Sequence, residues 1–233
     1  IFRLEDKHIL YRDKYLIVLN KPAGVDTQPT PSRYKGTLYD ALLVLLGPTH
    51  GRKKPELGMV QRLDRGTSGL MVFSVHQNTH KGLSKIFLEH QVEKRYLALV
   101  ENSPVPASSE IRSMLARSRK FNRMVSVQKG GKNAITRYQT RIAAEQGALL
   151  EIELLTGRSH QIRVHLSEHG SALLGDSLYG GAMTSAGLSL DRPMLHAFKL
   201  AFVHPVTAEA LSFELPMPKD MQQLCDKLFD SAI

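Results

Sequence analysis

The chain has 233 residues, enough for one large domain or two closely packed halves, and 42% of them are apolar, which is ordinary for a globular protein. Its single cysteine, Cys225, excludes an internal disulfide and a thiolate metal cluster, and no apolar run approaches the ~20 residues of a membrane span. The formal net charge of +9 favours a polyanionic partner, and the cysteine content fits a reducing, cytoplasmic setting.

The N-terminal part of the chain mixes strand and helix signals. Its patterns predict two strands around a turn at 9–19, a helix at 37–46, a buried strand at 68–75 and a helix capped by Asn78. The sequence Asn20-Lys21-Pro22-Ala23-Gly24 interrupts the strand signal, because proline lacks a backbone donor and glycine tolerates unusual dihedral angles.

The middle of the chain continues the mixture. A strand is predicted at 93–100, and a hairpin with its turn at 145–147 is predicted over 134–155. The Pro/Ser-rich link at 103–109 is the expected hinge between two subdomains, and Ser159 is the expected cap of a short helix. Interleaved helices and hairpins predict an α+β fold with a largely antiparallel mixed sheet.

Basic residues concentrate between 111 and 144, where no Asp or Glu occurs. They are Arg112, Arg117, Arg119, Lys120, Arg123, Lys129, Lys132, Arg137 and Arg141. A solvated surface normally mixes both signs of charge, so this bias predicts a surface that contacts phosphates, although solubility alone would also explain it. We expect Arg119, Lys120 and Arg123 to bind a phosphate-rich substrate there.

Asp64 stands between two arginines in the sequence QRLDRGTSG. Arg62 and Arg65 create a positive field that keeps a carboxylate ionised, and an ionised carboxylate can act as a base, a nucleophile or a metal ligand. A structural turn, in which Asp64 bonds nearby amides and pairs with arginine, explains the same residues. The residue types alone favour the structural turn.

A second polar segment, TGRSHQIRVHL from Thr156, follows a strand signal and opens a helix, an arrangement that suits anion binding through free amides. Arg163 lies one turn from Ser159 and can face the same side. His160 and His165 are five residues apart and do not share a helix face, so we expect no metal site here.

These segments together resemble the RluA family of pseudouridine synthases, from about Ile9 to Leu215. The family's patterns appear in order as NKPAG, QRLDRGTSG, KRYLALV and TGRSHQIRVHL, followed by GDSLYG, LHA and HP. The resemblance implies the pseudouridine synthase catalytic fold, with helices flanking the sheet and a central active-site cleft. It also implies a single catalytic domain over 1–233 with two subdomains, and it makes Asp64 functional rather than structural. The family's patterns begin close to the start of the given sequence, so no S4-type RNA-binding domain is expected within 1–233.

The resemblance further implies a role for each matching residue. Asp64 matches the catalytic aspartate, Tyr96 the tyrosine that packs on the target base, and Arg163 the basic residue that pairs with the aspartate. Leu166 matches an apolar wall of the pocket, and Arg62 matches an arginine that fills the space left by a flipped nucleotide. The implied reaction converts uridine to pseudouridine without redox chemistry or net hydrolysis, so no cofactor is expected.

Gln61 departs from the family pattern, which usually has histidine at this position. Glutamine donates and accepts hydrogen bonds but does not gain a proton near neutral pH. We therefore expect Gln61 to change local hydrogen bonding or RNA contacts at the substrate-binding site more than the reaction itself.

The expected partner is RNA, ribosomal or transfer, with no DNA or membrane binding and a monomeric chain. A non-catalytic RNA-binding protein on the same fold is the main alternative, prompted by Gln61 and the charge of +9, and it would bind RNA with a steep salt dependence but without turnover. A carboxylate-based hydrolase such as a nucleosidase would need a second acid near Asp64, and the motifs offer none.

Overall fold

The computed structural model describes residues 2–47 and 57–229, and the chain folds into two compact units. Unit 1 comprises Ile1–Glu93 and Phe198–Leu215, and unit 2 comprises Lys94–Ala197 and Pro216–Ile233. Each unit is assembled from segments that are distant in the sequence. In the described part of the chain, no helix has the length and apolar character to cross a membrane.

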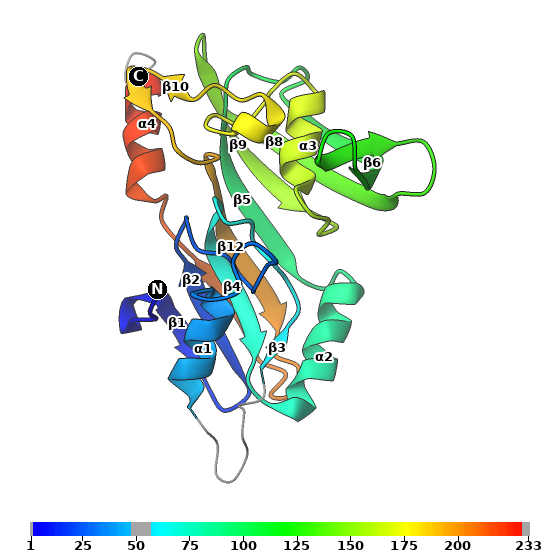
Figure 1. Ribbon diagram of the computed structural model, residues 1–233, viewed down its shortest axis with the longest axis vertical. Coiled ribbons are helices and arrows are strands. Elements are labelled where there is room, and N and C mark those ends of the chain that lie inside the picture. The colour runs from blue at the N-terminus through cyan, green and yellow to red at the C-terminus, as the bar shows by residue number, and fades with distance from the viewer. Residues whose placement is uncertain (1, 48–56, 230–233) are drawn as a thin grey trace. The chain divides into compact units, whose positions relative to one another are not determined.

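Unit 1 is a sheet with two helices (Figure 1). Its elements are η1 Asp6–His8, β1 Ile9–Arg12, β2 Leu16–Lys21, α1 Leu38–Leu46, β3 Gly58–Met59, β4 Ser68–Ser74, α2 Gln77–Leu88, most of β12 Leu195–Val203, and β13 Ala210–Glu214. The strand order is β1-β2-β4-β12, with β13 on β12 and β3 on β4. Alternate residues of β2, β4 and β12, such as Leu16, Val72 and Phe202, form its apolar core.

Short polar contacts set the bounds of the unit 1 elements. The carboxylate of Asp13 accepts bonds from the amides of Tyr15 (2.7 Å) and Leu16 (2.8 Å), which closes the predicted turn between β1 and β2. Thr37 caps α1 as part of a capping box.

The cap predicted for α2 is wrong. The helix begins at Gln77, and the imidazole of His76 accepts the amide of Asn78 instead. His76 is in the extended conformation that an N-cap requires, and Asn78 already lies inside the helix.

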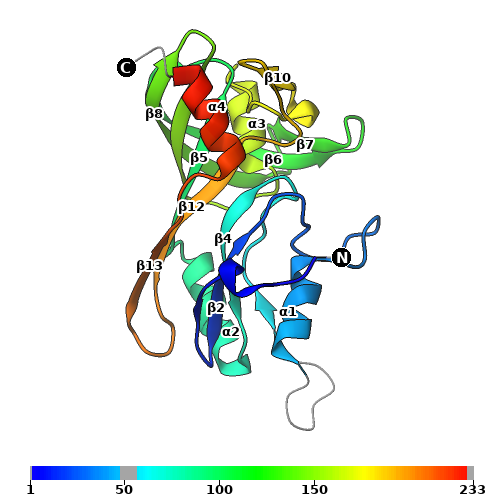
Figure 2. The same ribbon diagram turned by 90° about the vertical axis from the view of Figure 1, so that its left-hand side faces the viewer.

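Unit 2 is a second, strongly curled set of antiparallel strands with two helices (Figures 1 and 2). Its elements are β5 Glu93–Val100, β6 Ser108–Ser118, β7 Arg123–Val127, β8 Lys132–Ala144, β9 Gly147–Leu154, α3 Gln161–Glu168, η2 Ser177–Tyr179, β10 Thr184–Ser185, β11 Leu188–Ser189 and α4 Lys219–Phe229. The order of the long strands is β5-β9-β8-β6-β7. The strand at 93–100 and the hairpin over 134–155 are therefore confirmed.

The two helices of unit 2 pack on different side-chain sets of this sheet. Leu99 and Leu149 belong to the cluster that includes Leu224 of α4 and the buried Cys225, whose side chain is part of this apolar core. A separate apolar cluster holds the other helix, with Leu115 of β6 packed against Val164 of α3. The α+β class and the largely antiparallel sheet are confirmed. The segment 103–109 lies inside unit 2, and its role as a hinge stays a prediction.

Candidate active site

The loop that carries Asp64 is tied to the end of β2 by a buried lysine. Lys21 is fully buried, and its ammonium donates to the carbonyl oxygens of Pro22 (3.0 Å), Val25 (2.8 Å) and Arg65 (3.4 Å). The amide of Gly24 donates to the same Arg65 carbonyl at 2.7 Å. Gly24 has φ +85, a backbone conformation that residues other than glycine rarely adopt. The NKPAG motif thus clamps the residue that follows Asp64.

Thr27 fixes the other side of the same loop. Its buried hydroxyl donates to the carbonyl of Leu63 (2.7 Å), and the amide of Leu63 approaches the same hydroxyl at 3.3 Å. The amide of Thr67 donates to the backbone oxygen of Asp64 at 3.0 Å, which closes a turn. The backbone of Asp64 is therefore held on both flanks, and its side chain is half-buried.

The two arginines beside Asp64 do not behave alike. Arg65 forms an ion pair with Asp26 at 2.9 Å, and Arg33 approaches the same carboxylate oxygen at 3.5 Å. Arg65 therefore engages a second carboxylate, and the contribution of both flanking arginines to the field at Asp64 stays a prediction. The side chain of Arg62 is exposed.

Gln61, the departure from the family pattern, is only partly exposed. Its Nε2 atom is buried and has no hydrogen-bond partner among the described residues. A buried donor without a partner is costly in a folded protein, so this amide is a candidate for a contact with substrate.

In unit 2, the TGRSH turn leads into α3 through a left-handed residue. His160 is the N-cap with φ 54 and makes no side-chain capping bond, so the predicted cap at Ser159 is wrong. Instead, the side chain of Gln161, the first residue of the helix, accepts hydrogen bonds from the TGRSH turn. Its Oε1 accepts from the amide of Arg158 (3.0 Å) and the hydroxyl of Thr156 (2.7 Å).

Arg163 on α3 is nearly buried and forms a bidentate ion pair with Asp176, whose side chain is 1% exposed. Its Nε donates to one carboxylate oxygen at 2.7 Å and its Nη2 donates to the other at 2.8 Å. The ring of Tyr179 lies under the guanidinium, with 4.9 Å from Cζ to the ring centroid. No role was predicted for Asp176 beyond its place in GDSLYG; the order in which that motif follows TGRSHQIRVHL was the available signal.

Polar contacts anchor α3 to the strands beneath it. His165 is fully buried, with Nδ1 at 2.8 Å from the hydroxyl of Thr136 and Nε2 at 2.9 Å from that of Ser113. Burial lowers the pKa of His165 to about 4, so the ring is neutral near pH 7. Leu166 is fully buried on the same helix, as an apolar wall requires.

Tyr96 lies on β5, on the side of the unit 2 sheet that α3 covers. It is 7% exposed and pairs in register with Ile152, which pairs in turn with Tyr138 on β8. Lys94, two residues earlier, points to the same side by strand alternation. Burial, with the nearby guanidinium of Arg158, lowers the pKa of Lys94 to about 8. No residue pattern pointed to Lys94, because a lysine at a strand end usually faces solvent.

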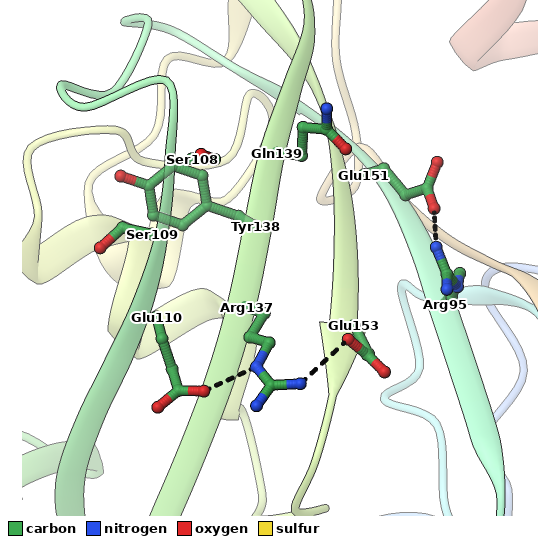
Figure 3. Close-up of a pocket in the computed structure, with 9 residues that line it drawn as sticks. All are labelled: Arg95, Ser108, Ser109, Glu110, Arg137, Tyr138, Gln139, Glu151 and Glu153. Carbon is green, nitrogen blue, oxygen red and sulfur yellow. Dashed lines mark hydrogen bonds and ion pairs between the residues drawn. The ribbon is translucent and has the colours of Figure 1, made fainter.

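The predicted basic surface is smaller than the sequence suggested. Figure 3 shows Arg137 between Glu110 and Glu153, and Arg95 beside Glu151, around a shallow pocket on the unit 2 strands. Glu110 also pairs with Arg112, and Glu151 with Arg141. Glutamates on neighbouring strands therefore balance several arginines of the basic run.

Much of the remaining positive charge of the run lies at the hairpin between β6 and β7. Arg119, Lys120 and the side chain of Phe121 are exposed there, and the guanidinium of Arg123 stacks on the rings of Phe121 (5.8 Å) and Tyr179 (5.5 Å). Cations interleaved with an aromatic ring are typical of surfaces that bind nucleic acid.

The predicted site residues thus form two sets. Gln61, Arg62 and Asp64 share one clamped loop of unit 1. Unit 2 carries Tyr96 on β5, and Arg163 and Leu166 on α3. The members of each set belong to one unit, and the roles of these residues stay predictions.

Known proteins similar in sequence share one function. Residues 15–168 match the RNA pseudouridylate synthase family. The ribosomal large subunit pseudouridine synthase D of Zymomonas mobilis is 38% identical over 96% of this chain and 73% of its own length. An RNA pseudouridine synthase of Bacillus subtilis, YhcT, is 37% identical over 95% of this chain and 72% of its own length.

The fold points the same way. The human RNA pseudouridylate synthase domain containing 4 protein superposes with a TM-score of 0.74 at 26% identity, covering 94% of this chain and 92% of that one. The fold predicted from the RluA-family resemblance is therefore confirmed. With the ordered motifs, the clamped aspartate loop and these relatives, the chain belongs to the RNA pseudouridylate synthase family and is an isomerase that acts on RNA.

Proposed function

We propose that this enzyme converts one or more uridines of large-subunit ribosomal RNA to pseudouridine, with Asp64 as the carboxylate that starts the reaction. The observation that carries the proposal is the rigid loop around Asp64, which Lys21 and Thr27 hold from two sides. A catalytic carboxylate gains from such fixation because a small misplacement costs much of the rate. The ribosomal substrate is supported by the name of the Zymomonas mobilis relative.

The chemistry needs one ionised carboxylate and a closed pocket. The bond from ribose C1′ to uracil N1 breaks, the base turns, and C1′ bonds to C5; N1 gains a proton and C5 loses one. Asp64 serves either as a nucleophile at C1′ or as a base at C2′. The arrangement needs no cofactor, because no electrons leave or enter the substrate.

The other predicted site residues hold the uracil base or stabilise the negative charge of the Asp64 carboxylate. Arg163 is the cation that stabilises the Asp64 carboxylate, Tyr96 packs on the uracil and assists loss of the C5 proton, and Leu166 closes the apolar wall. Arg62 fills the gap in the RNA after the uridine leaves its stack. Extrusion costs a few kcal/mol, which one or two stacking or phosphate contacts offset.

The test combines a cellular and a purified readout. Pseudouridines are mapped across all RNAs of a deletion strain complemented with wild type, Asp64→Asn or Asp220→Asn. We expect a large-subunit site to disappear in the deletion, to return with wild type and Asp220→Asn, and to stay absent with Asp64→Asn. Purified Asp64→Asn should bind the RNA with wild-type affinity and turn over at least ~10³-fold more slowly.

Each failure has its own meaning. Loss of a transfer RNA site alone would replace the ribosomal substrate. Full modification by Asp64→Asn would remove Asp64 from the reaction. RNA binding by the wild type without turnover on any RNA, unchanged by Gln61→His, would favour a non-catalytic RNA-binding protein.

A further inference from the structure

The loop over residues 175–181 is shaped to present two side chains to Arg163. A Cβ on Gly175 (φ +79) would lie 1.9 Å from the carbonyl oxygen of Arg192, and a Cβ on Gly181 would lie 1.9 Å from that of Leu173. Only glycine allows the backbone to approach so closely at both ends. Between them, Asp176 and Tyr179 reach the guanidinium of Arg163.

Asp176 restrains the plane of the guanidinium. Its two oxygens engage Nε and Nη2, so rotation about the bonds of the Arg163 head would break two charge-assisted hydrogen bonds. The carboxylate is almost fully buried, so water cannot easily replace either bond. The two bonds use the Nε–Nη2 edge of the guanidinium, and Nη1 lies outside that edge because the group is planar.

Tyr179 supports the face of the same group and is itself fixed. Its hydroxyl accepts the amide of Met124 at 3.1 Å and lies 2.8 Å from Nδ1 of His160, and its carbonyl accepts the hydroxyl of Ser167 at 2.7 Å. The ring therefore cannot swing away from Arg163 without breaking its hydroxyl contacts to β7 and to the N-cap of α3, and the Ser167 bond holds the backbone of Tyr179 near the other end of that helix.

We infer that Asp176 and Tyr179 are positioning residues for the isomerisation, which hold Arg163 in one orientation so that its Nη1 edge meets the charge of the reacting centre. The inference rests on the proposed role of Arg163 and deepens it. Neither residue touches the substrate in this scheme. Their effect on the reaction is transmitted entirely by the guanidinium.

The first test is a double-mutant cycle on the full chain with its ribosomal RNA substrate. Asp176→Asn should lower kcat about 10²-fold with KM within threefold, because binding is kept and alignment is lost. In an Arg163→Gln background, Asp176→Asn should lower kcat no further. Multiplicative losses would overturn the inference. If Arg163→Gln alone leaves kcat unchanged, the proposed function of Arg163 fails instead.

Asp220→Asn is the matched control, because Asp220 forms the same bidentate pair with Arg192 at 2.6 and 2.8 Å elsewhere in unit 2. It should leave kcat unchanged. A loss equal to that of Asp176→Asn would show that breaking any such pair disturbs the unit, and would overturn the inference.

A spectroscopic readout does not depend on turnover. In ¹⁵N spectra the Nε–H of Arg163, assigned by its absence in Arg163→Lys, should exchange slowly with water in wild type and at least tenfold faster in Asp176→Asn. Unchanged exchange would overturn the inference. For Tyr179, the Phe variant keeps the ring and should retain kcat within about threefold, whereas the Leu variant should lose tenfold or more; equal kcat values for the two would remove Tyr179 from the scheme.

Discussion

A buried lysine carries much of the order at the Asp64 loop. Lys21 places its side-chain nitrogen in the interior of unit 1, where it donates to three backbone carbonyls. Such a group is stable only while its acceptors stay in place, so the strand end and the catalytic loop are fixed together.

Lys21→Met tests this coupling at a single residue. Methionine fills a similar volume but removes the donor that bonds the carbonyls of Pro22, Val25 and Arg65, of which the last still accepts the Gly24 amide, so we expect the free energy of unfolding to fall by about 3 kcal/mol. The loop would also lose its clamp, and kcat should drop at least tenfold. Urea denaturation and single-turnover rates measure the two effects.

Lys14→Met, an exposed lysine near the same sheet, is the control and should change neither quantity. An Lys21→Met protein with wild-type kcat would show that the loop holds its shape without the lysine.

At the residue scale the sequence predicts which residues belong to the site better than it predicts which groups their side chains contact. Ordered motifs pointed to Asp64, Arg163 and Leu166, but not to the bond between Lys21 and the loop or to Asp176 as the partner of Arg163. Those contacts join residues that are far apart along the chain, and residue type alone does not say which carboxylate a cation will meet. Arg65 shows this most clearly, since it turns to Asp26.

At the scale of elements, periodicity was a good guide and caps were not. The strand at 93–100 and the helix from Leu38 appear as predicted, because burial on one side imposes a regular pattern. His76 and His160 are N-caps that no propensity scale favours. Tertiary structure sets both N-cap positions. His76 is the cap because of the direction in which the chain leaves β4, and His160 because of the tight TGRSH turn.

The β6–β7 hairpin gives a prediction at this scale. Arg119 and Lys120 are exposed at its tip, so replacing both with alanine should weaken RNA binding and lower the salt slope of log K by about two. Binding is measured between low and moderate salt on the same RNA.

The control for the hairpin replaces Arg112 and Arg137, which removes the same charge from the strands where Glu110 balances it. This pair should change the slope much less. Equal slopes for the two double variants would mean that total charge, rather than the hairpin, sets the affinity.

At the scale of the whole molecule, the division into units could not be read from the sequence. Residues 198–215 return to unit 1 and residues 216–233 return to unit 2, so each unit combines segments that are far apart along the chain. The Pro/Ser-rich link at 103–109 looked like a boundary because its composition is that of a linker, yet it joins two strands of one unit. Packing between segments that are distant along the chain defines the units, and only a three-dimensional structure reveals it.

The free energy of unfolding should depend on pH, and we expect His165 to make a large contribution to that dependence in unit 2. Its pKa is lowered to about 4 in the folded protein and is ordinary, near 6.5, in the unfolded chain. The unfolded state therefore binds more protons between these values, and stability, fully present above pH ~6.5, is lost as the pH falls towards 4. We expect a loss of about 2 kcal/mol between pH 7 and 4.5 from this group, less than the full shift because solvent relaxes the site.

Urea unfolding followed by a probe in unit 2, compared for wild type and His165→Gln, isolates this contribution to the free energy of unfolding. Glutamine can still bond Thr136 or Ser113 but cannot titrate, so the variant should lose less stability on acidification than wild type. It should also be less stable at pH 7, because its amide does not reproduce both ring contacts of the histidine. Parallel pH curves for the two proteins would contradict the assignment, since they would place the titrating group elsewhere in the chain.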